Sequence, residues 1–251
     1  MKVYVVANQK GGIGKTTTAT NLAGILSKRG STLLIDADPQ GNSTSTYQAK
    51  IKDVATLYDV MIDSDKLPMD EAIQHMPNGD IVASDPLLSK AEKMLDGDVE
   101  GFYRLKDALD MLDGYEYVVI DTAPALNVIM YNSLIAADEV IIPVTADAYS
   151  LQGINQLYDT IMAVKRRQNP SLKIAGLLLV KYAGRSNLER TTREDIEVNA
   201  DEMGTKLFAT AIRECVKTKE AQEKKVLLID YAPKCNTLLD YLAFTEELLA
   251  E

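Results

Sequence analysis

The stretch KGGIGKTTT, residues 10–18, is the clearest indication of the fold, and it follows closely on an apolar run, VYVVAN (residues 3–8). Its glycines allow backbone N–H groups to turn toward a bound anion, and the amphipathic stretch 14–28 predicts a helix whose positive N-terminus points at the same anion. Lys15 can neutralise the terminal phosphates of a nucleotide, and the Thr16 hydroxyl can bind Mg²⁺. The stretch therefore predicts a phosphate-binding loop between a strand and a helix, in a modified form of G-x-x-x-x-G-K-[ST].

Further along the chain, short apolar runs alternate with amphipathic stretches. The predicted strands are TLLID (32–36), YVVID (117–121), EVIIPV (139–144), KIAGLLLV (173–180) and KVLLID (225–230). Most of them are continuously apolar, which is typical of parallel strands buried on both faces. The predicted helices are Leu126 to Ala136, Leu151 to Gln168, Leu188 to Met203 and Asn236 to Leu249. The pattern predicts an α/β fold: a doubly wound, mostly parallel sheet with helices on both faces, in a single domain over residues 1–251.

The segment 47–101 is the least patterned part of the chain. It is polar and rich in Met and Asp, and we predict a peripheral helix pair and one short strand, DIVAS (80–84). Its composition indicates no particular chemistry.

Composition argues against several classes of protein. The longest apolar runs have the length of strands, well below the roughly 18–20 residues that span a bilayer, so we expect no membrane crossing and a cytoplasmic protein. The chain has two cysteines, Cys215 and Cys235, without CxxC spacing. Neither a disulfide framework nor a thiolate metal site is indicated.

The net charge of −10 argues against nucleic-acid binding, but the charges are unevenly distributed. Residues 1–164 hold 12 Lys and Arg against 23 Asp and Glu, whereas residues 165–225 hold 14 against 9. The segment 165–225 is therefore either an ordinary, less acidic surface or a basic face for a phosphate backbone.

Three carboxylates follow predicted strands. Asp36 and Asp38 lie in LLIDADPQGN, and Asp121 ends YVVID. The carboxyl ends of parallel strands form the edge where such sheets bind ligands. Next to a phosphate loop, Asp121 is placed to hold Mg²⁺ directly or through water, and Asp38 to orient an attacking water. Taken singly, each could instead cap a helix.

These motifs, together with EVIIPVTADAYSLQGINQL, YAGRSNL and CVKTKEAQEKKVLLIDYAP, resemble the ParA/Soj branch of the deviant Walker A ATPases, the family that includes MinD and the nitrogenase iron protein. The resemblance runs nearly end to end. It implies that Lys10 reaches across a two-fold interface to the nucleotide of the other subunit, so that a homodimer forms in the ATP state. A cation contributed in trans can stabilise charge in the transition state.

Carried over residue by residue, the resemblance implies a complete nucleotide site. The phosphates would be bound by Lys10, Gly11, Gly12, Ile13, Gly14, Lys15, Thr16 and Thr17. Lys10, Lys15 and Asp38 would be catalytic, and Thr16, Asp36 and Asp121 would serve the Mg²⁺ ion. Tyr182 and Pro233 would lie at the adenine, and because an NKxD stretch is absent from the sequence, ATP is favoured over GTP.

Branches of this family use the ATP-dependent dimer for different functions. Cys215 and Cys235 do not lie where the iron protein's cluster cysteines fall, and the C-terminal stretch 236–251 has four acids and no base, unlike a MinD-type membrane helix. The resemblance favours non-specific DNA binding on the nucleoid and release by a ParB-like partner. The candidate DNA contacts are Arg185, Arg213, Lys217 and Lys219. Two alternatives stay open: a positioning ATPase for a protein cargo and a MinD-like membrane regulator.

Overall fold

A computed structural model describes residues 1–62, 67–95, 97–147, 150–184 and 186–250 of the protein. The strands are β1 (Lys2–Val6), β2 (Thr32–Ala37), β3 (Ile73–Met76), β4 (Gly79–Val82), β5 (Tyr117–Thr122), β6 (Glu139–Val144) and β7 (Lys173–Leu179). They form one sheet in the order β3-β4-β2-β5-β1-β6-β7, in which only β3 and β4 pair antiparallel. The predicted doubly wound, mostly parallel sheet is confirmed.

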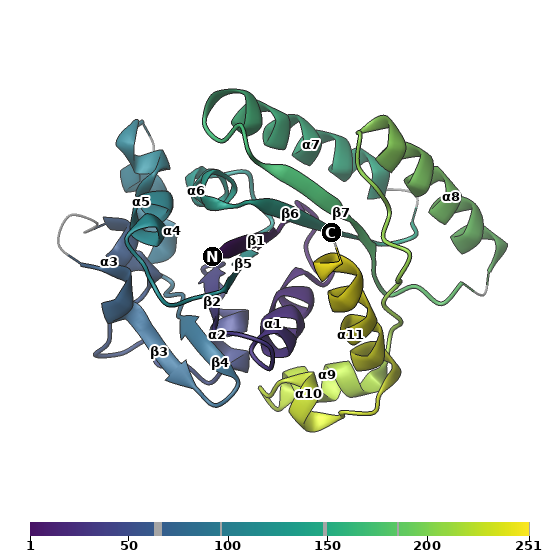
Figure 1. Ribbon diagram of the computed structural model, residues 1–251, viewed down its shortest axis with the longest axis horizontal. Helices are drawn as coiled ribbons and strands as arrows, with labels where there is room; N and C mark the ends of the chain where they lie inside the picture. Colours follow the sequence, from purple (N-terminus) through teal and green to yellow (C-terminus); the bar gives the residue numbers. More distant parts are fainter. Residues whose placement is uncertain (63–66, 96, 148–149, 185, 251) are drawn as a thin grey trace.

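Helices cover both faces of this sheet (Figure 1). One face carries α3 (Leu57–Ile62), α4 (Leu88–Leu95), α5 (Arg104–Asp110), α6 (Val128–Ala136), α7 (Ser150–Arg167) and α8 (Asn187–Glu202). The other carries α1 (Lys15–Leu26), α9 (Val216–Glu223), α10 (Leu228–Tyr231) and α11 (Asn236–Leu249). A short helix α2 (Asn42–Thr46) follows β2, and two 3₁₀ turns, Met69–Ala72 and Glu100–Phe102, complete the elements.

The continuously apolar strands are buried on both sides because their alternate residues enter two different cores. In β1, Val3 and Val5 join the core under α6 and α7, whereas Tyr4 and Val6 join the core under α1 and α11. All four side chains are at most 4% exposed. A strand with a solvent-facing side would alternate apolar and polar residues, so the absence of alternation is explained by this double burial.

The predicted helices agree with the structure to within two residues at each end. The loosely patterned segment 47–101 contains the predicted pair as α3 and α4 and the predicted strand DIVAS as β4. It also contains β3, an antiparallel edge strand that the sequence analysis did not predict. Its four residues are half-buried or exposed and lack a strong apolar pattern, so no periodicity marks it.

One predicted strand was wrong. KVLLID (225–230) is a turn followed by the one-turn helix α10. Lys225 has φ +54°, which breaks the chain direction between α9 and α10, and Leu227 and Leu228 enter the core beside α1. A short apolar run buries its side chains equally well from a strand or from a helical turn, and length alone did not separate the two.

The C-terminal helix α11 packs on α1 and buries its apolar side. Leu238, Tyr241, Phe244 and Leu248 are at most 2% exposed, and the Tyr241 hydroxyl shares a hydrogen bond of 3.1 Å with Thr18 of α1. Within the described ranges, every helix is too short or too polar to cross a lipid bilayer.

Candidate functional site

The phosphate-loop residues form a turn between β1 and α1 that requires glycine. Gly12 has φ +68° and Gly14 has φ +107°, backbone conformations that residues with a Cβ rarely adopt. Gly14 precedes the first helical residue, and no side chain caps this end of α1. The first N–H groups of the helix are therefore directed at the loop, where an anion can accept them.

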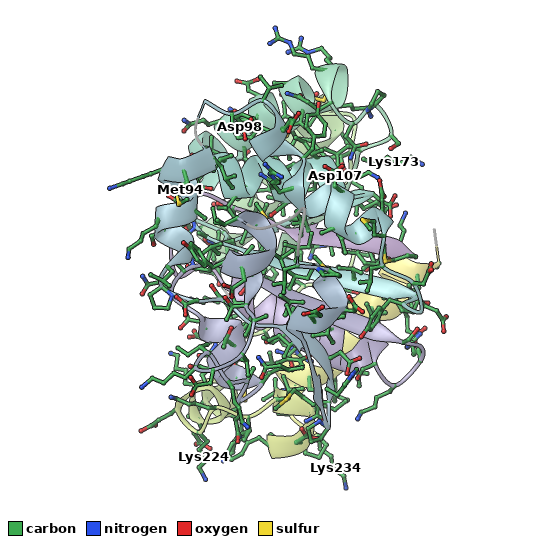
Figure 2. The ribbon with its side chains drawn as sticks, turned by 90° about the vertical axis from the view of Figure 1, so that its left-hand side faces the viewer. Met94, Asp98, Asp107, Lys173, Lys224 and Lys234 are labelled. Carbon is green, nitrogen blue, oxygen red and sulfur yellow. The ribbon has the colours of Figure 1, made fainter. Side chains whose placement is uncertain are left out.

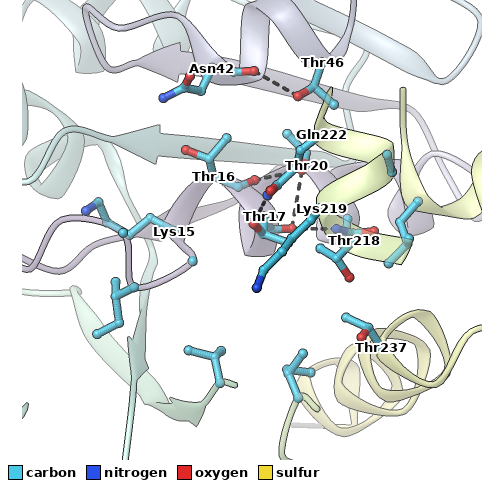
Figure 3. Close-up of a pocket in the computed structure, with 18 of the residues that line it drawn as sticks. Lys15, Thr16, Thr17, Thr20, Asn42, Thr46, Thr218, Lys219, Gln222 and Thr237 are labelled. Carbon is cyan, nitrogen blue, oxygen red and sulfur yellow. Dashed lines mark hydrogen bonds between the residues drawn. The ribbon is translucent and has the colours of Figure 1, made fainter. Parts of the chain in front are cut away.

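This turn opens into a cavity of about 640 Å³, which is within the size range of nucleotide and cofactor sites. One side of it, the loop wall, contains Gly11 to Thr17 and Asp38. The other side, the α9 wall, is drawn from residues 212–228, and residues of α2 and α11 also contribute to the lining. Figure 3 shows Lys15, Thr16 and Thr17 on the first wall and Lys219 and Gln222 reaching in from the second.

Lys15 is the cation of the loop wall. Only 6% of the residue is exposed, and its Nζ donates a hydrogen bond of 3.2 Å to the carbonyl oxygen of Lys10. Burial lowers the pKa of Lys15, and the carboxylates of Asp121 and Asp38 oppose this shift. A buried ammonium that two carboxylates stabilise, at the end of the phosphate loop, is suited to bind phosphate.

Asp38 lines the cavity directly after β2. It is 8% exposed, and its Oδ1 accepts the Gln40 N–H at 2.9 Å, which holds the carboxylate in a tight turn. Its Oδ2 accepts no hydrogen bond from the described residues, so it could orient a water as predicted.

Asp36 and Asp121 lie opposite each other on the paired strands β2 and β5, and both are fully buried. Burial raises the pKa of each carboxyl, and the neighbouring carboxylates raise it further. The surroundings differ, however. The two oxygens of Asp36 are occupied by Thr44, through its N–H and hydroxyl at 2.7 Å, and by the Asp38 N–H at 3.2 Å. Asp36 therefore fixes α2 and the Asp38 turn from behind the site.

Asp121 fits the predicted Mg²⁺ partner better. Its Oδ2 accepts the Ser43 hydroxyl at 2.8 Å, whereas the buried Oδ1 has no hydrogen-bond partner among the described residues. The hydroxyls of Ser43 and Thr16 lower the pKa of Asp121 against the effect of burial, so Thr16 lies beside this carboxyl. No cluster of three His, Cys, Asp or Glu side chains that could hold a metal ion occurs in the described part of the chain.

Lys10 does not line this cavity. Its Nζ forms an ion pair of 2.6 Å with Asp147 and lies 3.5 Å from the Thr145 hydroxyl, beyond the end of β6. The backbone of Lys10 is still tied to the loop, since its N–H donates to Asn8 Oδ1 at 2.9 Å and its carbonyl accepts from Lys15. Of the two lysines in the loop, Lys15 lines the cavity and Lys10 points away from it.

Several residues of the cavity were not predicted from the sequence: Gln222 and Thr218 belong to the α9 wall, and Lys181 follows β7. Gln222 Nε2 donates to Thr17 Oγ1 at 2.8 Å, and Lys181 Nζ donates to the Gly12 carbonyl at 2.7 Å. Thr218 also faces the cavity. These residues follow the loop by more than 160 positions and belong to no short motif, so only the fold brings them to it.

The predicted adenine contacts are not among the residues that line the cavity. The Tyr182 ring lies under Arg193, 5.8 Å from its guanidinium carbon, and Pro233 is exposed between α10 and α11. Their neighbours Val180, Lys181 and Leu228 line it instead. The assignment of Tyr182 and Pro233 to the adenine stays a prediction.

The candidate DNA contacts are exposed and paired with acids. Arg213 forms a bidentate pair with Asp240, at 2.9 and 2.6 Å, while Lys217 pairs with Glu220 and Lys219 with Glu214, both at 2.8 Å. Lys219 also lines the cavity. Arg185 lies outside the described residues.

Comparisons with known proteins place the chain in a family. A family model described as an AAA domain matches residues 1–174. The chain is 38% identical to the chromosome partitioning protein ParA of Caulobacter vibrioides, over 100% of this chain and 94% of that protein. It is 34% identical to the sporulation initiation inhibitor protein Soj of Bacillus subtilis, over 99% of this chain and 98% of that protein.

Solved structures agree in fold. A McdA–ATP complex from Cyanothece has a TM-score of 0.87 at 26% identity, covering 100% of this chain and 96% of that chain. Cobyrinic acid a,c-diamide synthase from Mycobacterium smegmatis, with bound ADP and magnesium, has a TM-score of 0.85 at 29% identity, covering 99% and 94%. With the modified phosphate loop, the strand-end carboxylates and full-length relatives, the chain belongs to the ParA/Soj family of deviant Walker A ATPases.

Proposed function

We propose that the protein is a DNA-partitioning ATPase. In this proposal residues 1–251 act as one domain that binds ATP and Mg²⁺ in the cavity and forms a homodimer in the ATP state. The dimer binds DNA non-specifically on the nucleoid, and a ParB-like partner releases it by stimulating slow hydrolysis.

The observation that carries the proposal is the position of Lys10. If Lys10 were only a solvated surface residue, we would not expect hydrogen bonds between its backbone and the phosphate loop. If it were a second phosphate ligand of the same subunit, its ammonium would point into the cavity. Neither description fits: its backbone is bonded to the loop while its ammonium is held outside, on Asp147. This arrangement supports a role toward a second subunit, for which the exposed ion pair can be exchanged at small cost.

Within one subunit, the residues have separate tasks. Gly11 to Thr17, which include Lys15, bind the phosphates, and Asp38 holds the attacking water through its Oδ2. Thr16 and Asp121 would hold Mg²⁺, which when bound neutralises charge on the phosphates. Asp36 keeps Asp38 in place through the bond to its N–H.

DNA binding rests on the basic end of the molecule. Lys217 and Lys219 lie on α9, and Figure 2 shows Lys224 and Lys234 extending outward at the same end. Exposed pairs such as Lys217 with Glu220 contribute little stability, so a phosphate can replace the acid. Two copies in a dimer would present two such surfaces.

The test is binding to non-specific duplex DNA at low and moderate salt, with ATP or ADP. We expect binding that requires ATP, weakens with salt and falls in Lys217→Ala. Lys10→Ala should bind ATP as a monomer and lose DNA binding together with dimerisation. Lys90→Ala, an exposed lysine on α4, is the matched control.

The alternative function is that of an ATPase that positions a protein cargo. It is favoured by the net charge of −10 and by the acidic partner of every described candidate contact. ATP-dependent dimerisation without DNA binding at any salt concentration would refute the DNA proposal and favour this alternative.

A further inference from the structure

The fold brings the two cysteines of the chain together at the edge of the cavity. Cys215 immediately precedes α9 and Cys235 immediately precedes α11. Both thiols are free and half-buried, so reagents from solvent can reach them. Nothing in the proposed ATPase cycle uses either thiol.

The contact between these segments is specific. Thr237 of α11 donates its hydroxyl to the Arg213 carbonyl at 2.7 Å, and Arg213 in turn is held by Asp240 through its N–H and guanidinium. Two residues on from Arg213 is Cys215, and two residues back from Thr237 is Cys235. The hydrogen bond between Thr237 and Arg213 therefore brings the two segments that carry the cysteines side by side.

The surroundings of the Cys235 thiol agree with this proximity. Burial raises the pKa of Cys235, the backbone N–H groups of Leu238 and Thr237 oppose that shift, and contact with the Cys215 side chain adds to it. Protonated Cys235 is the poorer first nucleophile, so the first attack on an oxidant falls to Cys215.

We propose that Cys215 and Cys235 form a reversible intramolecular disulfide that locks the α9 wall of the cavity. The oxidant is a small disulfide. The Cys215 thiolate attacks it and releases one small thiol, and Cys235 then loses its proton and attacks the mixed disulfide at the Cys215 sulfur, which releases the second. The protein loses two hydrogen atoms and the small disulfide gains them.

The lock would act on nucleotide exchange. Cys215 lines the cavity, and α9 contacts the phosphate loop through Gln222 and Thr17. The helix α11, which follows Cys235, is hydrogen-bonded to α1 through Tyr241 and Thr18. A covalent link between the starts of α9 and α11 restrains α9 against α11 and, through it, against α1, so we expect slower release of ADP. This consequence rests on the proposed nucleotide site, whereas the disulfide does not.

The disulfide is tested with oxidised glutathione. Thiols are counted under denaturing conditions without reductant, and peptides are mapped by mass spectrometry. We expect the parent to lose both thiols as a monomer, with a Cys215–Cys235 linkage that dithiothreitol reverses. Cys215→Ser and Cys235→Ser, with one cysteine each, should give only glutathione adducts or links between chains. A parent that behaves like these variants would overturn the proposal.

The lock is tested by the release of a fluorescent ADP analogue from oxidised and reduced protein. We expect slower release after oxidation in the parent and no change in the double variant Cys215→Ser/Cys235→Ser. Equal rates in a parent shown to be cross-linked would refute the lock and leave the modification site. Failure of the analogue to bind reduced protein would instead refute the nucleotide site, while the thiol count would still decide on the disulfide.

Discussion

The two walls of the cavity are built in different ways. The loop wall rests on buried strand ends, and the charged groups in it and directly behind it hardly reach solvent: Lys15, Asp36, Asp38 and Asp121 are at most 8% exposed. The α9 wall is assembled from residues 212–228 and carries exposed charges that pair with one another, such as Lys219 with Glu214. The family match over residues 1–174 includes the first wall and ends before the second.

This difference indicates a division of labour. Buried charges with fixed partners suit chemistry, because a low-dielectric, pre-arranged site strengthens each interaction with the phosphates. Exposed pairs suit regulation, because partners can be exchanged without loss of the fold. Substitutions in the loop wall should therefore have large effects on nucleotide chemistry, and substitutions in the α9 wall small ones.

The largest effect is expected at Asp38. In Asp38→Asn the bond from the Gln40 N–H can persist while the charge that orients the water is lost. ATP should still bind, and turnover should fall by about 10²–10⁴-fold. Phosphate release and nucleotide affinity, measured on the same preparation, check this. Turnover within tenfold of the parent would remove Asp38 from the catalytic role.

The next largest effect, on ATP affinity, is expected at Lys15 in the same wall. Lys15→Ala removes a buried cation between two acids, and ATP affinity should weaken on the order of a hundredfold, or about 3 kcal/mol. Isothermal titration with ATP measures it, and Lys90→Ala is the exposed control. Retained affinity would contradict the assignment of the phosphate loop.

The same contrast explains what the sequence could predict. The apolar runs, the glycine loop and Asp121 were predictable because each depends on neighbours within a few residues and on the rule that parallel strands end at one edge. Gln222 and the proximity of Cys215 to Cys235 depend on how α9 and α11 pack, which no local pattern encodes. The strand prediction for KVLLID was wrong for the same reason, because the packing of Leu227 and Leu228 beside α1, and not the pattern of the six residues, determines the local structure.

Two of the buried carboxyls also predict how stability depends on pH. Burial raises the pKa of Asp36 and of Asp121 in the folded state, so the folded protein takes up protons that the unfolded chain has lost. The free energy of unfolding should therefore fall as pH rises from about 4 into the neutral range, by at most about 1.4 kcal/mol per pH unit for each proton.

Urea unfolding at several pH values measures this slope. Asp36→Asn should make it shallower, since the amide has no proton to lose. Mg²⁺ with ATP should also flatten it, because a cation beside Asp121 favours the ionised carboxylate. A slope unchanged in the variant would show that these carboxyls are not the source.

The smallest effect is expected at Gln222. It tests most directly whether the loop wall and the α9 wall have separate roles. Gln222→Ala removes an exposed, neutral hydrogen bond to Thr17, worth about 0.5–1.5 kcal/mol, so nucleotide affinity should change by no more than roughly tenfold. Turnover per bound nucleotide should stay at the parental value, because the residue touches neither Lys15 nor Asp38. A loss of turnover as large as that of Asp38→Asn would mean that the α9 wall takes part in the chemistry, and the division between a catalytic wall and an exchangeable one would fail.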